Sequence, residues 1–100
     1  MSTRLPDDEL LKLIHLLKDR SAALPAATGS DLASIQTRRD AILQLIGDLE
    51  RGHGAKFNTR WNGATLVMAG IRATSTSGPA GAMQNWITAA YRELDRRRAA

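Results

Sequence analysis

The stretch AKFNTRWNGATLVMAGIRA, residues 55–73, decides the fold because it fits two kinds of secondary structure. Its apolar residues recur at the spacing of one helical face, namely Phe57, Trp61, Ala64, Met68 and Ile71. The pair Asn62-Gly63 counts against a helix, since a mid-helix glycine destabilises it by about 1 kcal/mol. The periodicity nevertheless favours a helix over about residues 57–69.

The alternative is a β-hairpin over residues 56–69, with Asn62-Gly63 as its two-residue turn. Three residues before the turn then face three after it: Phe57, Thr59 and Trp61 opposite Ala64, Leu66 and Met68. An isolated hairpin is only marginally stable in water, and no third strand is evident. We therefore prefer the helix and keep a hairpin packed on three helices as the alternative.

The sequence on either side of this stretch predicts three further helices, over about residues 6–20, 30–51 and 78–97. Pro6 and Pro79 suit a first helical turn, where the missing N–H costs little. Ser30 or Asp31 can cap the second helix, and Gly52 can end it. We predict an all-α protein, a small bundle of three to four helices forming one helical domain over residues 1–100.

The first predicted helix is apolar over more than one face. Its largest side chains include Leu10, Leu13, Ile14 and Leu17, and polar residues occupy only a narrow stripe. Such a helix either lies at the centre of the domain or packs against a second copy of the chain. Both interpretations remain open from the sequence, and the second predicts a dimer through these four residues.

The composition limits the classes of protein to which the chain can belong. With 100 residues it is long enough for one domain, and 43% hydrophobic residues are typical of globular proteins. The absence of cysteine excludes disulfides and thiolate metal sites. No apolar run approaches the ~18 residues of a membrane span, and the acidic N-terminus is unlike a secretory signal. We predict a cytoplasmic protein with no membrane partner.

The charge is unevenly distributed although the net charge is only +4. Residues 1–50 hold six basic and eight acidic residues, whereas residues 51–100 hold eight basic and two acidic ones. No acidic residue occurs between Arg51 and Arg92. Because nucleic-acid affinity comes largely from neutralisation of phosphates, this layout suggests a polyanionic partner.

The candidate nucleic-acid or anion-binding residues are the cations of that half, two arginines of the second helix, and a hydroxyl-rich run before the last helix. They are Arg38, Arg39, Lys56, Arg60, Arg72, Thr74, Ser75, Thr76, Ser77, Arg92, Arg96 and Arg97. The hydroxyls matter because a helix start offers free N–H groups and a positive dipole end to a phosphate.

Catalytic signatures are missing from the sequence. The only histidines are His15 and His53, and His53 lies between two glycines that would position it poorly. No zinc-protease, phosphate-loop or dinucleotide motif occurs. We predict a protein that is not an enzyme and has no cofactor, no metal and no catalytic residue.

Two functions fit these observations. The first is a small basic helical protein that binds nucleic acid in a regulatory or accessory role. The alternative is a protein–protein adaptor, inhibitor or assembly subunit that acts through its Leu/Ile-rich helices. Nucleic-acid binding predicts that Arg38, Arg39, Arg60, Arg72 and Arg92 share one face, whereas scattered arginines favour the adaptor.

Overall fold

The computed structural model describes residues 5–25 and 31–99. The elements in chain order are α1 (Asp7–Ala22), α2 (Leu32–His53), β1 (Lys56–Arg60), β2 (Gly63–Met68), β3 (Ile71–Ser75) and α3 (Pro79–Ala99). The three strands form one antiparallel sheet in the order β1-β2-β3. The protein is therefore a mixed α/β fold, and the prediction of an all-α bundle is wrong.

The three flanking helices lie where they are predicted, within two residues at each end. Asp31 caps α2, and its side chain accepts a hydrogen bond from the Ala33 N–H at 3.1 Å. Residue 30, the predicted start of the second helix and the other candidate cap, lies outside the described residues. Capping and apolar periodicity were thus sufficient signals for all three helices.

The predicted helix over residues 57–69 is replaced by a β-hairpin, so the alternative is partly right. Phe57, Thr59, Ala64 and Leu66 share one face as predicted, but the partners differ: Phe57 pairs with Leu66 and Thr59 with Ala64, whereas a turn at Asn62-Gly63 would pair Thr59 with Leu66. The turn, however, consists of Trp61 and Asn62, one residue earlier than predicted, and Gly63 begins β2. Trp61 consequently lies in the turn and not on a strand.

A third strand, missed in the sequence, is the reason that the hairpin wins over the helix. Residues 71–75 pair with β2, and Met68 opposes Ile71 across a two-residue turn. That turn has positive φ at both Ala69 (55°) and Gly70 (76°), as a tight hairpin turn of the twisted type requires. Alanine rarely adopts this conformation, so the Ala69-Gly70 pair gave a weak signal.

Alternation along the strands separates the sheet into two faces. The inner face comprises Phe57, Thr59, Ala64, Leu66, Met68, Ile71, Ala73 and Ser75. The open face comprises Lys56, Asn58, Arg60, Thr65, Val67, Arg72 and Thr74. The inner face supplies four fully buried core residues, whereas the residues of the open face are exposed or half-buried.

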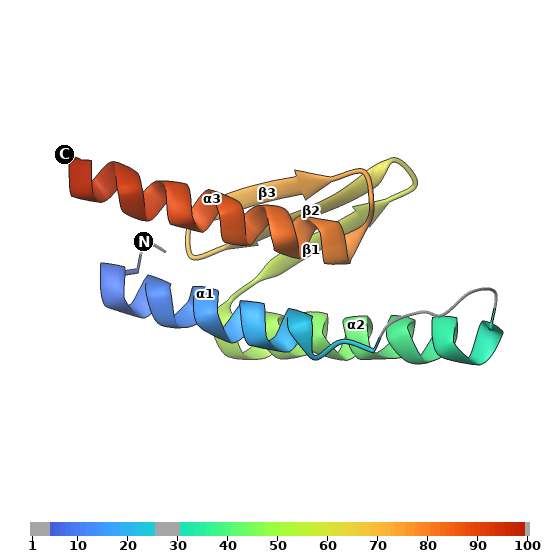
Figure 1. Ribbon diagram of the computed structural model, residues 1–100. Coiled ribbons are helices and arrows are strands. Elements are labelled where there is room, and N and C mark those ends of the chain that lie inside the picture. The colour runs from blue at the N-terminus through green and yellow to red at the C-terminus, as the bar shows by residue number, and fades with distance from the viewer. Residues whose placement is uncertain (1–4, 26–30, 100) are drawn as a thin grey trace.

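Helix α3 lies across the inner face, packs against β2 and β3, and is hydrogen-bonded to the sheet (Figure 1). Trp86, at 0% exposure, donates from its indole Nε1 to the Met68 carbonyl oxygen at 3.1 Å. Asn85 donates from Nδ2 to the Thr74 carbonyl oxygen at 2.6 Å. At the start of the helix, a Cβ on Gly81 would overlap the Ser75 hydroxyl, so glycine permits the close approach.

Helix α1 packs against α3 at the centre of the domain. Leu10, Leu13, Ile14 and Leu17 are at most 5% exposed and belong to the same core as Leu66, Met68 and Trp86. The predicted dimer through these four residues is therefore corrected: they have no surface to offer a second copy. The wide apolar arc of α1 reflects contact with several elements of its own chain.

Two ion pairs between distant segments fix α1 against its neighbours. Arg20 Nη2 lies 2.8 Å from Asp48 Oδ2 of α2. At the other end, Arg97 of α3 donates to the Leu5 carbonyl oxygen and to Asp7 Oδ1, at 2.8 and 2.9 Å. The beginning of α1 is thereby held beside the end of α3 (Figure 1).

Helix α2 runs beneath the rest of the domain, and its first half extends past the other elements (Figure 1). Its second half contributes Leu45 and Leu49 to the core. Its first half exposes Leu32 (66%) and Ile35 (42%), and Leu43 (56%) is exposed at the middle of the helix. The molecule is accordingly elongated, with extents of 48 × 25 × 24 Å.

Candidate nucleic-acid interface

The open face of the sheet carries basic and hydrogen-bonding side chains in aligned rows. The strand register places Lys56 and Arg72 at the two ends of one row, with Val67 between them. The next row consists of three polar residues, Asn58, Thr65 and Thr74. Arg60 lies beyond that row, beside the β1–β2 turn. The positions follow directly from alternation, since residues i and i+2 share one face.

The three cations enclose the polar row. Lys56 and Arg72 are two strand spacings apart, roughly 10 Å, and Lys56 and Arg60 are separated by roughly 13 Å along β1. Within residues 5–25 and 31–99, none of the three forms an ion pair with a carboxylate. Their charges are therefore available to an external anion.

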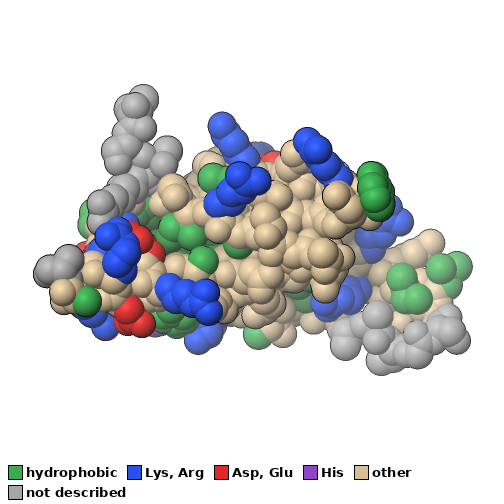
Figure 2. Space-filling model, turned by 90° about the horizontal axis from the view of Figure 1, so that it is seen from above, with side chains coloured by type: hydrophobic (Ala, Val, Ile, Leu, Met, Phe, Trp, Pro, Cys, Tyr) green, Lys and Arg blue, Asp and Glu red, His purple; other side chains and the backbone are tan. Residues whose placement is uncertain are grey.

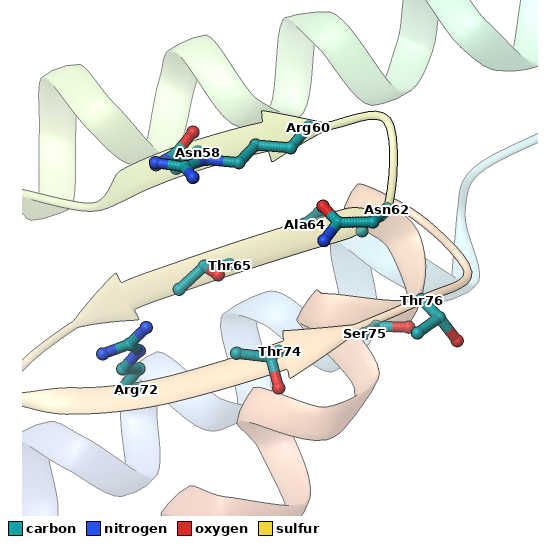
Figure 3. Close-up of a pocket in the computed structure, with 10 residues that line it drawn as sticks. Asn58, Arg60, Asn62, Ala64, Thr65, Arg72, Thr74, Ser75 and Thr76 are labelled. Atoms are coloured by element: carbon teal, nitrogen blue, oxygen red, sulfur yellow. The ribbon is translucent and has the colours of Figure 1, made fainter.

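The face is hollowed between the outer strands, with a volume of about 440 Å³. The lining residues are Asn58, Arg60, Asn62, Gly63, Ala64, Thr65, Arg72, Thr74, Ser75 and Thr76. Figure 3 shows the Arg60 side chain running back along β1 toward Asn58, and the Arg72 side chain reaching from β3 toward β2. No helix crosses the strands on this side (Figure 3).

Electrostatically, the hollow favours an anion. None of its lining residues is acidic, and two of them are arginines. Amide and hydroxyl groups of Asn58, Thr65 and Thr74 add donors between the charges. An extended polyanion such as a sugar–phosphate chain fits this combination of spaced cations and intervening hydrogen-bonding groups.

The sequence-predicted hydroxyl run is divided between this hollow and the start of α3. Thr74, Ser75 and Thr76 line the hollow. The Ser75 hydroxyl also accepts a hydrogen bond from the Ser77 N–H at 3.0 Å, so this N–H is already satisfied. Ser77 lies outside the hollow, beside Gly78 and Pro79, where α3 begins. The run therefore contributes residues to the hollow, and the Ser77 N–H at the start of α3 is not free for a phosphate.

The remaining predicted cations lie elsewhere. On α2, Arg38 donates to the Pro25 carbonyl oxygen at 3.1 Å, and Arg39 is exposed beside an apolar groove. On α3, Arg92 is exposed, and Arg96 forms an ion pair with Glu93.

Arg97 has a structural role that its neighbours lack. Its side chain is only 10% exposed, and it is bound to Asp7, Glu93 and the Leu5 carbonyl. It ties α3 to the start of α1. Because α3 covers the inner face, Arg92, Arg96 and Arg97 do not belong to the open face of the sheet.

The arginines therefore do not share one face. Arg60 and Arg72 meet on the open face, whereas Arg38 and Arg39 lie on α2 and Arg92 on α3. Seen from above, basic side chains are distributed around the molecule, and acidic ones gather mainly at the end where α1 begins (Figure 2). By the criterion drawn from the sequence, this scatter counts against a face shared by all five arginines and favours the adaptor. A smaller basic surface of Lys56, Arg60 and Arg72 remains on the sheet.

Sequence analysis missed three residues that belong to this surface. Asn58 and Thr65 share the open face, and alternation around a correctly placed turn would have found them. Trp61, which the helical pattern places on an apolar face with Phe57 and Met68, is 97% exposed at the β1–β2 turn. The available signal was Asn62, because asparagine favours turns and a two-residue turn that ends at Asn62 includes Trp61.

Other kinds of site find little support in the described part of the chain. Among residues 5–25 and 31–99, no three metal-ligating side chains come together. No helix among them is long and apolar enough to cross a membrane. The hydrogen bond from Arg20, with help from Arg51, lowers the pKa of Asp48, and the ion pair with Glu93 raises the pKa of Arg96. Both perturbed groups lie on helices, away from the hollow.

Comparison with protein-family models, curated proteins and solved structures found no match for this chain.

Proposed function

We propose that this protein binds nucleic acid through the open face of its sheet, in an accessory or regulatory role and without catalysis. The observation that carries the proposal is the set of three unpaired cations, Lys56, Arg60 and Arg72, around a polar hollow with no acidic residue. The proposal replaces a dispersed set of basic residues by one surface built on three strands.

The physical basis is neutralisation of phosphates. Each lysine or arginine that contacts a phosphate releases condensed counterions, which makes binding favourable and dependent on salt. Asn58, Thr65 and Thr74 can donate to phosphate or sugar oxygens and so fix the position of the strand. Val67, half-buried in the row between Lys56 and Arg72, leaves a flat surface between the charges.

The test is binding of labelled oligonucleotides over a range of salt concentrations. Three phosphate contacts predict a plot of log affinity against log salt with a slope of about −2 to −3. Arg72→Gln should weaken binding and reduce the magnitude of that slope by about 1. Arg92→Gln is the matched control, because it removes the same charge from α3, on the other side of the sheet.

Two outcomes would contradict the proposal. One is the absence of binding by the intact chain at low salt and micromolar protein. The other is an equal loss from Arg92→Gln and Arg72→Gln, which would indicate attraction by net charge and no defined surface.

A second candidate function rests on the exposed apolar stripe of α2, which comprises Leu32, Ile35, Ile42, Leu43 and Ile46. We infer that this stripe pairs with the same stripe of a second copy, so that the chain acts as an assembly subunit. The stripe is symmetric about Arg39, since Leu32 and Ile46 lie seven residues before and after it, and Ile35 and Leu43 four residues before and after it. In an antiparallel pair about this middle, Leu32 of each copy opposes Ile46 of the other and Ile35 opposes Leu43, which makes the apolar surface self-complementary.

This pairing is tested by sedimentation over a range of protein concentrations. The chain should form a dimer, and Leu43→Glu should return it to a monomer without unfolding it, because Leu43 is already 56% exposed. A chain that remains monomeric at the highest concentration would remove this candidate.

A further inference from the structure

The two tryptophans of the chain lie in opposite environments. Trp86 is completely buried, and its indole N–H is satisfied by the Met68 carbonyl. Trp61 is 97% exposed, the most exposed large hydrophobic residue in the described chain. An indole gains free energy from burial, so a tryptophan left in water contributes nothing to the stability of this domain.

The location of Trp61 connects it with the basic surface. It is the first residue of the β1–β2 turn, and both of its neighbours, Arg60 and Asn62, line the hollow of the open face. Asn62 points across the mouth of the hollow toward the strands (Figure 3). Trp61 is therefore next in the chain to the end of the hollow at which the Arg60 side chain begins, although the indole itself is not one of the lining groups.

We propose that the ligand is a single-stranded nucleic acid, with one unpaired base stacked on Trp61 and its backbone on Arg60 and Arg72. This inference rests on the proposed function and specifies its substrate. In a duplex the faces of the bases are covered by their neighbours, so an indole at a hairpin tip can stack only on a base that is unpaired. Stacking of bases on aromatic side chains, beside cations that follow the backbone, is how single strands are bound without sequence preference.

The geometry also explains why the tryptophan is at the tip. A side chain on the open face itself would project straight out from the sheet and occupy the hollow. At the turn, the indole extends the surface beyond the last pair of strand residues, Arg60 and Gly63, and leaves the hollow free for the backbone.

The experiment compares two ligands of equal length: a thymidine strand of about 12 nucleotides and an abasic strand with the same phosphates. Trp61→Ala should weaken binding of the thymidine strand by about 5- to 140-fold and leave the abasic strand within about 2-fold. Trp61→Phe is the conservative control and should retain most of the affinity. Tryptophan fluorescence should be quenched on binding in the intact chain, and not in Trp61→Phe, because Trp86 is buried.

The outcomes separate this inference from the function on which it rests. If Trp61→Ala binds both strands as the intact chain does, while Arg72→Gln weakens both, the stacking role is overturned and phosphate binding stands. If a duplex of the same length binds more tightly than the thymidine strand, the assignment to single strands is overturned. If the intact chain binds none of the three at low salt, the proposed function itself fails.

Discussion

The two faces of the sheet differ in burial although they are built from alternate residues of the same strands. On the inner face, Leu66 and Met68 of β2 are at most 1% exposed and pack beneath α3. On the open face, Thr65 is half-buried and Arg72 is exposed. From this difference we expect stability and the proposed binding to be separable, residue by residue, along a single strand.

This separation predicts that variants of the inner face change stability, whereas variants of the open face change binding. The physical reason is that a buried side chain loses contacts with many neighbours when it is shortened, and an exposed one loses few. The variants below test whether the two faces can be changed independently, from the largest expected effect on stability to the smallest.

The largest effect is expected from the pair of tryptophans. Trp86→Ala should lower the free energy of unfolding by about 3–5 kcal/mol, because it empties the core and frees the Met68 carbonyl. Trp61→Ala should change it by less than about 0.5 kcal/mol. Urea unfolding followed by circular dichroism measures both. Comparable losses from the two variants would show that Trp61 is buried in solution.

A smaller effect is expected from the glycine where β2 approaches β3. A Cβ on Gly63 would lie 2.7 Å from the Ser75 carbonyl oxygen, and its φ of +149° is unfavourable for other residues. Gly63→Ala should therefore destabilise the fold by about 1–3 kcal/mol. Gly52→Ala is the control, because nothing lies within 4 Å of that position in α2. It should be neutral or stabilise the helix by up to about 1 kcal/mol.

A weaker effect on stability is expected when the pH is lowered, and it involves the ion pair between Arg20 of α1 and Asp48 of α2. Arg20 lowers the pKa of Asp48 below its ordinary value of 3.8, so the folded state binds fewer protons than the unfolded state near this pH. The stabilisation is complete above the unfolded pKa and is lost as pH falls through the folded one. Asp48→Asn should flatten the loss of stability below about pH 4.

The control for the acid experiment is another carboxylate of the same helix. Asp40 is exposed on α2, and Asp40→Asn should leave the acid limb of the stability curve unchanged. Unfolding measured at intervals between neutral pH and about pH 3 makes the comparison. An equal flattening by both substitutions would mean that overall charge, and not the Arg20–Asp48 pair, governs acid stability.

The smallest effect on stability is expected from the open face itself. Arg60→Gln and Arg72→Gln remove charges with no ion-pair partner in the described chain, so thermal unfolding should be unchanged within about 0.5 kcal/mol. The same variants should lose affinity for nucleic acid. A marked loss of stability in either would break the proposed division between the two faces.

Local signals were sufficient for the helices and insufficient for the sheet. Pro6, Asp31 and Pro79 mark helix starts whatever the rest of the chain does, and the predicted bounds were close. The hairpin was named as the alternative because Asn62-Gly63 is a turn signal, but the turn was placed one residue too late, which displaces the strand pairing by two residues. A one-residue shift matters because it moves Trp61 from a strand to the tip.

The candidate site was predictable in its chemistry and not in its geometry. The absence of acidic residues between Arg51 and Arg92 is a property of the sequence, and Lys56, Arg60 and Arg72 were named as candidates because of it. That Arg38 and Arg92 lie apart from them could not be predicted without the sheet. A bundle of helices has no flat face on which residues of three segments align.

The sequence by itself determined the three helices, the basic acid-free stretch and the amphipathic alternation within residues 56–75. Only the tertiary structure decided that this alternation becomes a sheet, because a hairpin needs both its third strand and the cover of α3 to be stable. It also decided that Leu10 and Ile14 are core residues and that Trp61 is not. Burial depends on which distant segments meet, and that information is not contained in any local pattern.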